Sequence, residues 1–214
     1  MSPASAALDI DKHPGAEMQI HYRQLLFFFV SAIVLTESCG AAGGPFKLTS
    51  SDLPPNRPIS ERHVANAWGC HGNEESPSLQ WSGAPPGTRS FAITMYDPAK
   101  PPTSGWWHWV VYDVPATVSE LPRGSGNPGS TGLPADAKQG LPDGDAPQPR
   151  YYGPCPGAGA PPHRYVITAY ALNVERLDLP ATATAAYIDY VITTKAIAKS
   201  SIIRSYHRAS ADKK

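Results

Sequence analysis

The sequence predicts a mainly β protein that forms one domain with a single late helix. Short apolar segments alternate with turn residues along the chain, and the 18 glycines and 24 prolines follow no repeat. Residues 90–97 (SFAITMYD) show the two-residue alternation of a strand. A length of 214 residues suits one domain with a sizeable core, and no internal repeat is visible.

The strand and helix patterns can be placed along the chain. Residues 106–114 (WWHWVVYDV) form a β-branched and aromatic run that suits a strand buried on both faces. Residues 119–162 are dense in Pro and Gly, which predicts a long loop that is functional or mobile. Residues 183–194 have helical spacing, with Pro180 expected in the first turn. The remaining expected strands are residues 46–50, 63–68, 78–83, 164–173 and 200–206.

Charge excludes one large class of function. The formal net charge is zero, and only 17% of the residues are charged. No cluster of lysines and arginines occurs along the sequence, so the electrostatic pattern of a nucleic-acid-binding protein is missing.

The N-terminal region is typical of an export signal. Residues 18–44 contain a basic patch at His21 and Arg23, an apolar run over residues 25–35 and then small residues. The apolar run is too short for a stable transmembrane anchor. Residues 1–17 are interpreted as a start-site extension or a disordered segment, residues 45–208 as the folded domain and residues 209–214 as a flexible tail. We therefore expect a periplasmic or secreted protein. Two alternatives are a buried N-terminal helix and a lipoprotein that is acylated at Cys39.

The cysteines support export. Removal of Cys39 with the signal would leave Cys70 and Cys155, an even pair that favours a disulfide in an oxidising compartment. A zinc site that uses these cysteines and His71 is the alternative, but the usual paired spacing of zinc ligands is missing. We expect no metal and no cofactor.

Three polar residues are expected at strand ends. Asp97 ends one predicted strand, His108 lies near the start of the next, and His163 precedes a third. If these strands are neighbours, the three side chains meet at one rim. The sequence has no nucleophile elbow, zinc-protease motif, phosphate-binding loop or dinucleotide fingerprint, so no enzyme is expected.

Three segments resemble phosphatidylethanolamine-binding proteins, in particular their bacterial branch labelled Raf kinase inhibitor-like. The segments are SPSLQWSGAPPGTRSFAITMYDP, SGWWHWVVYDVPA and YYGPCPGAGAPPHRYVITAYAL. The resemblance runs from about residue 45 to residue 206. It implies a large antiparallel sheet, a smaller flanking sheet and C-terminal helical structure. It also favours the pairing of Cys70 with Cys155.

The resemblance further implies a small pocket that binds phosphate or phosphorylated head groups. The ligand-binding residues implied by position are Asp97, His108, Gly153, Pro154 and His163. Histidines can donate hydrogen bonds to phosphate oxygens, a carboxylate can fix a histidine tautomer, and a tryptophan such as Trp107 can form an apolar pocket wall.

The chain departs from the family pattern at two places. Ala99 stands where the family has a second acid, so we predict that the pocket tolerates a doubly charged phosphate better than its relatives do. Thr193 and Lys195 stand where many bacterial members have histidines, so no role of those histidines transfers.

Three functions remain open on the sequence alone. The first is an exported protein that binds a small anionic group, with or without a regulatory role. The second is a protease or kinase inhibitor that acts on a protein partner through residues 119–162. The third is an esterase or phosphoesterase that uses a His/Asp pair, but no nucleophile or metal is evident for it.

Overall fold

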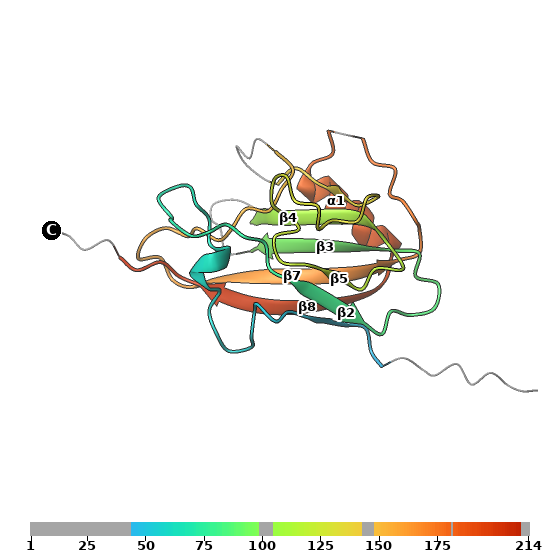
Figure 1. The fold of residues 1–214 in the computed structure, drawn as a ribbon, viewed down its shortest axis with the longest axis horizontal. Coiled ribbons are helices and arrows are strands. Elements are labelled where there is room, and N and C mark those ends of the chain that lie inside the picture. Colours follow the sequence, from blue (N-terminus) through green and yellow to red (C-terminus); the bar gives the residue numbers. More distant parts are fainter. Residues whose placement is uncertain (1–43, 99–104, 143–147, 181, 211–214) are drawn as a thin grey trace, which may run out of the picture. The chain divides into compact units, whose positions relative to one another are not determined.

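The computed structural model describes residues 44–98, 105–142, 148–180 and 182–210. Four long strands and the two-residue strand β6 form a five-stranded antiparallel sheet in the order β6-β4-β3-β7-β8. Figure 1 shows β4, β3, β7 and β8 side by side. A second antiparallel sheet has three short strands in the order β1-β2-β5. The strands are β1 (Lys47–Thr49), β2 (Leu79–Ser82), β3 (Ser90–Asp97), β4 (Trp106–Pro115), β5 (Glu120–Leu121), β6 (Lys138–Gln139), β7 (His163–Leu172) and β8 (Ala196–Tyr206).

Each face of the large sheet buries its own apolar cluster. One cluster joins the large sheet to the small sheet, and it includes Trp81 of β2, Phe91 of β3 and Ile167 of β7. The other cluster lies under the helix α1 (Ala185–Lys195), whose Ile188 and Ile192 are buried against the opposite face of the sheet. Because both faces are covered, β3 and most of β4 consist of buried side chains, as the apolar run in the sequence predicts.

The predicted architecture of a large sheet, a smaller sheet and a late helix is confirmed, with corrections to three elements. Residues 63–68 form no strand. The chain there makes the short 3-10 helix η1 (Glu61–His63) and then an irregular segment. The backbone N–H of Ala65 donates to the carbonyl of Pro154 at 3.1 Å, outside any ladder. Residues 63–65 are therefore buried by contacts with an irregular partner segment and not by strand pairing.

The segment 119–162 is more ordered than a long loop. It contributes β5 to the small sheet and β6 to the large sheet. Leu121 and Tyr151 in this segment are fully buried, so much of it belongs to the core.

The helix begins later than the sequence suggested. Its N-cap is Thr184, whose hydroxyl accepts a hydrogen bond from the N–H of Tyr187, and Pro180 lies before the first turn. The chain passes directly from Lys195 into β8, which is longer than the predicted strand at 200–206. The last regular element is therefore a strand that pairs with β7 along its length.

Several predictions fall outside the described residues. These are the N-terminal extension, nearly all of the expected signal segment, Ala99 and the last four residues of the tail. Among the helices that the structure does describe, none is both long and apolar enough to span a bilayer.

Candidate functional site

The topology brings Asp97, His108 and His163 to one end of the large sheet. Asp97 is the last residue of β3, His163 is the first residue of β7, and His108 lies near the start of β4. Since β3 is hydrogen-bonded between β4 and β7 and runs antiparallel to both, these three strand ends are adjacent. Asp97 is 3% exposed and His108 is 5% exposed, so the rim is mostly shielded from water.

A β-bulge sets the direction of His108. Trp109 pairs with Met95 and Trp107 pairs with Tyr96, which leaves His108 as the extra residue of β4. Such a bulge breaks the usual alternation and re-aims side chains. The ring of His108 consequently lies 5.2 Å from that of Tyr165, on the face that carries the first apolar cluster.

The bulge also moves the tryptophan that was expected to line the pocket. Trp107 packs against Tyr96, with ring centroids 4.5 Å apart, and joins the cluster under α1 on the other face. Trp106 lies on the His108 side, at 6.3 Å between ring centroids. Trp106 therefore takes the place that the sequence assigned to Trp107.

Asp97 and His163 form a direct pair. The Nδ1 of His163 lies 2.6 Å from Oδ2 of Asp97, and the two side chains are 4% exposed for Asp97 and 16% for His163. A carboxylate accepts hydrogen bonds, so Nδ1 of His163 carries the proton. This contact fixes the tautomer and turns Nε2 away from the carboxylate.

His108 is fixed in a similar way by the backbone. Its Nδ1 donates to the carbonyl oxygen of Tyr152 at 2.9 Å, and the N–H of Tyr152 donates to the carbonyl of His108 at 3.0 Å. Both imidazoles thus hold a proton on Nδ1 and can meet a ligand through Nε2.

Tyr165 lies between the two histidines and was not singled out by sequence reasoning. Its ring is 6.5 Å from that of His163, and the residue is 1% exposed. Burial, followed by the charge of Asp97, raises the pKa of Tyr165 well above its ordinary value, so the phenol stays neutral. Its place two residues after His163 on a strand, hence on the same face, is the signal that could have found it.

Gly153 lies in a space that leaves no room for a side chain. A Cβ on Gly153 would lie 2.4 Å from the carbonyl oxygen of His63 and 2.4 Å from the nitrogen of Ala65. The hydroxyl of Tyr151 also donates to the carbonyl of His63, at 2.7 Å. Residues 151–154 are therefore seated directly on the backbone of residues 63–65.

A disulfide links the same two segments. Cys70 and Cys155 are joined across 85 residues of sequence, with their Cα atoms 6.0 Å apart. Close to this bridge Trp68 has a positive φ of 53° and is 55% exposed. Its ring lies 5.9 Å from Tyr152 and 6.4 Å from Trp106, so it forms an outer aromatic rim that sequence reasoning missed. Only its nearness to Cys70 hinted at it.

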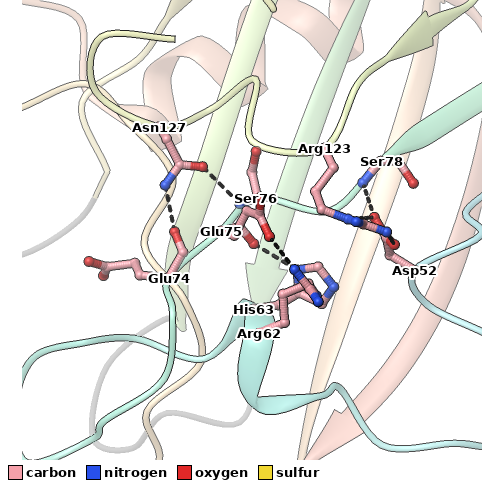
Figure 2. A network of polar contacts seen from close by, with 9 residues as sticks. All are labelled: Asp52, Arg62, His63, Glu74, Glu75, Ser76, Ser78, Arg123 and Asn127. Atoms are coloured by element: carbon pink, nitrogen blue, oxygen red, sulfur yellow. Dashed lines mark hydrogen bonds and ion pairs between the residues drawn. The ribbon is translucent and has the colours of Figure 1, made fainter.

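A polar network ties residues 62–63 and 74–78 to Asp52, Arg123 and Asn127 (Figure 2). The Nδ1 of buried His63 donates to the carbonyl of Glu75 at 2.7 Å, and Asn127 donates to the carbonyl of Glu74 at 2.7 Å. Asp52 pairs with Arg123, whose hydrogen bond holds the pKa of the Asp52 carboxyl well below its ordinary value. Burial lowers the pKa of His63, so this ring is neutral at pH 7.

Comparison with known proteins agrees with this fold. The sequence model of the family described as "Phosphatidylethanolamine-binding protein" matches residues 49–207. The chain is 37% identical to UPF0098 protein YbcL of Escherichia coli, over 83% of this chain and 96% of that protein. It is 40% identical to UPF0098 protein YbhB of the same organism, over 73% and 96%. It is 26% identical to a putative lipoprotein, LppC, of Mycobacterium tuberculosis, over 87% and 97%.

Solved structures give the same assignment. The crystal structure of YbcL, described as a new member of the mammalian PEBP family, aligns with a TM-score of 0.72 at 39% identity, over 76% of this chain and 98% of that one. A putative homologue from Chlamydia trachomatis aligns with a TM-score of 0.62 at 30% identity, over 77% and 98%. The chain belongs to the phosphatidylethanolamine-binding protein family.

Proposed function

We propose that this protein is an exported binding protein that takes a phosphate group or a similar small anion at the rim formed by Asp97, His108 and His163. The observation that carries the proposal is the orientation of two shielded imidazoles. Each holds its Nδ1 proton on a protein acceptor, at 2.6 Å for His163 and 2.9 Å for His108. Both rings come from the same end and the same face of one sheet.

The chemistry of this arrangement suits an anion. A protonated imidazole donates from Nε2 as well as Nδ1, and a charge-assisted hydrogen bond to a phosphate oxygen is about twice as strong as a neutral one. Asp97 holds the ring of His163 in place, since Oδ2 of Asp97 lies 2.6 Å from Nδ1 of His163. Burial lowers the local dielectric and strengthens each contact.

Three observations support export. The disulfide between Cys70 and Cys155 is of a kind that persists in oxidising compartments. A relative that covers most of the chain carries the name of a lipoprotein. The N-terminal sequence over residues 18–44 has the pattern of a signal peptide. Together they favour a periplasmic or secreted location.

The two other functions, a protease or kinase inhibitor that acts through residues 119–162 and an esterase or phosphoesterase, stay predictions. The described parts of residues 119–162 are tied into the domain, for example by the hydrogen bond of 2.9 Å from the N–H of Tyr151 to the carbonyl of Gly126. This segment supports the site from behind, and no contact in its described parts favours an inhibitory role or the hydrolysis of an ester.

Calorimetric titration with inorganic phosphate tests the proposal. The variants Asp97→Asn and His163→Ala should each bind phosphate at least about tenfold more weakly, because the first removes the supporting carboxylate and the second removes a charge-assisted hydrogen bond. His71→Ala removes an exposed histidine and serves as the matched control, with unchanged affinity expected. Equal phosphate affinity in the wild type and in His163→Ala would contradict the proposal.

A further inference from the structure

A hollow of about 420 Å³ lies beside β8, the outer strand of the large sheet. Three arginines line it, Arg57, Arg164 and Arg204, together with Asn56, Ile203 and Ser205. Arg164 stands opposite Ser205 in the ladder between β7 and β8, and Arg57 comes from the loop that precedes η1. The hollow thus joins three cations that are far apart in the sequence.

The charge of this hollow is unbalanced. None of its lining residues is acidic, so it carries three positive charges in a protein of zero formal net charge. In the part of the chain that the structure describes, Arg57 and Arg164 form no ion pair and no side-chain hydrogen bond.

Another hollow of the same protein shows the opposite pattern. Arg89 and Arg176 line a space of about 270 Å³ together with three carboxylates, those of Asp113, Asp136 and Glu175. There Arg89 pairs with Glu175 at 2.7 Å and Arg176 pairs with Asp136 at 2.9 Å. In this hollow the arginines are paired with neighbouring carboxylates, whereas the three-arginine hollow has no carboxylate in its lining.

The loop that carries Arg57 is held in place. Leu53 and Ile59 are buried at its two ends, and Pro54, Pro55 and Pro58 restrict the backbone between them. The N–H of Ile59 donates to the carbonyl of Ser205 at 2.8 Å, which fixes the loop along β8 (Figure 1). A loop ordered before binding loses little entropy when a ligand arrives.

Arg204 is also oriented in advance. Its Nε donates to the carbonyl of Leu53 at 2.7 Å, and its Nη1 donates to the carbonyl of Ile203 at 2.7 Å. A guanidinium has five N–H donors, so three of them remain for a ligand. Two carbonyls thus aim a planar fork of the kind that matches phosphate oxygens.

We propose that this hollow is a second anion site, distinct from the histidine rim, that binds an oxyanion with at least two negative charges, such as a pyrophosphate or a phosphomonoester. The anion is either free in solution or part of a lipid head group, since both present the same oxygens. Arg164 follows His163 on β7, and neighbouring strand residues point to opposite faces, so Arg164 lies on the face of β7 away from His163. Arg204 pairs with Tyr165 and lies on the other face, so the hollow extends around the edge strand β8.

Site-resolved NMR titration with inorganic pyrophosphate tests this proposal. In the wild-type protein, the backbone amides of Asn56, Arg57 and Ser205 should shift. The double variant Arg57→Ala/Arg164→Ala should bind about a hundredfold more weakly, since each of the two arginines it removes supplies a charge-assisted hydrogen bond that accounts for about tenfold in affinity. Arg89→Ala/Arg176→Ala removes the same charge from the other hollow and should leave these shifts and the affinity unchanged.

Two vesicle and ligand comparisons complete the test. In a co-sedimentation assay, the protein is mixed with phosphatidic acid vesicles or with phosphatidylcholine vesicles. If the wild type binds only the phosphatidic acid vesicles and the Arg57/Arg164 variant binds neither, the anion is a lipid head group. If the wild type binds pyrophosphate but neither kind of vesicle, the ligand is a free anion. Amide shifts that persist in the Arg57/Arg164 variant, or that fall equally in the Arg89/Arg176 variant, would overturn the proposal. Melting curves verify the fold of both variants.

Discussion

Removal of the disulfide should cost this protein a large part of its stability. The double variant Cys70→Ala/Cys155→Ala opens a loop that spans 85 residues of sequence. In the chain-entropy model, the loop-closure term for that length is about 4.6 kcal/mol at 25 °C, since the bridge restricts the unfolded chain. For a domain of this size the melting temperature should fall by roughly 10–18 °C.

Urea unfolding followed by tryptophan fluorescence measures this decrease. The denaturant slope m should rise in the variant, because the unfolded chain without the bridge is more expanded and exposes more surface. Wild-type protein in a reducing agent should match the variant, and the variant itself should not respond to the agent. A decrease below about 1 kcal/mol with an unchanged m would refute the reasoning that the bridge acts through the unfolded chain.

Three further predictions concern the support of the site. Gly153→Ala should lower the free energy of unfolding by about 3 kcal/mol, because its Cβ would meet two backbone atoms at 2.4 Å; a wild-type urea midpoint would contradict this close packing of Gly153. Tyr151→Phe should lower the free energy of unfolding by about 1–3 kcal/mol, because it leaves the buried carbonyl of His63 without its hydrogen-bond donor. The control Tyr187→Phe, on the exposed face of α1, should cause no measurable change in the same urea assay. Burial lowers the folded-state pKa of His63 below 6.5, so the stability that the neutral ring contributes is full above pH 6.5 and is lost as the pH falls towards the folded-state pKa. The variant His63→Gln should therefore flatten the slope of melting temperature against pH in that window. An unchanged slope would count against a buried neutral ring at His63.

The long strands of the large sheet could be predicted because their sequences consist mostly of apolar, β-branched or aromatic residues. The predicted limits of residues 90–97 agree with β3, and those of residues 106–114 differ from β4 by one residue. These runs are β-branched or aromatic and end at turn residues, so local preference and burial agree. The strand expected at residues 63–68 was wrong because the burial there comes from an irregular segment around Gly153, which no local pattern reports.

The meeting of Asp97, His108 and His163 could be predicted from the sequence, but the direction of the side chains around them could not. Strand ends were enough to group Asp97, His108 and His163, once the strands were taken as neighbours. The exchange of Trp106 for Trp107 depends on the bulge at His108, which is a property of the register between β3 and β4. Register depends on both strands at once, so a single strand sequence does not reveal it.

The arginine hollow shows the same limit for charge. Its three cations lie at positions 57, 164 and 204, so no window of the sequence is basic. They meet only because β7 pairs with β8 and the loop before η1 runs along the edge of β8. A net charge of zero therefore concealed a local concentration of positive charge.

The central claim is that a small anion binds at the rim through Nε2 of His108 and of His163. Histidine-selective ¹⁵N NMR during a phosphate titration tests it most directly. The Nε2 signals of both residues should shift with phosphate at one common affinity, while Nδ1 of His163 keeps the signature of its bond to Asp97. Phosphate-dependent shifts confined to the three-arginine hollow, with both imidazoles unchanged, would contradict the claim.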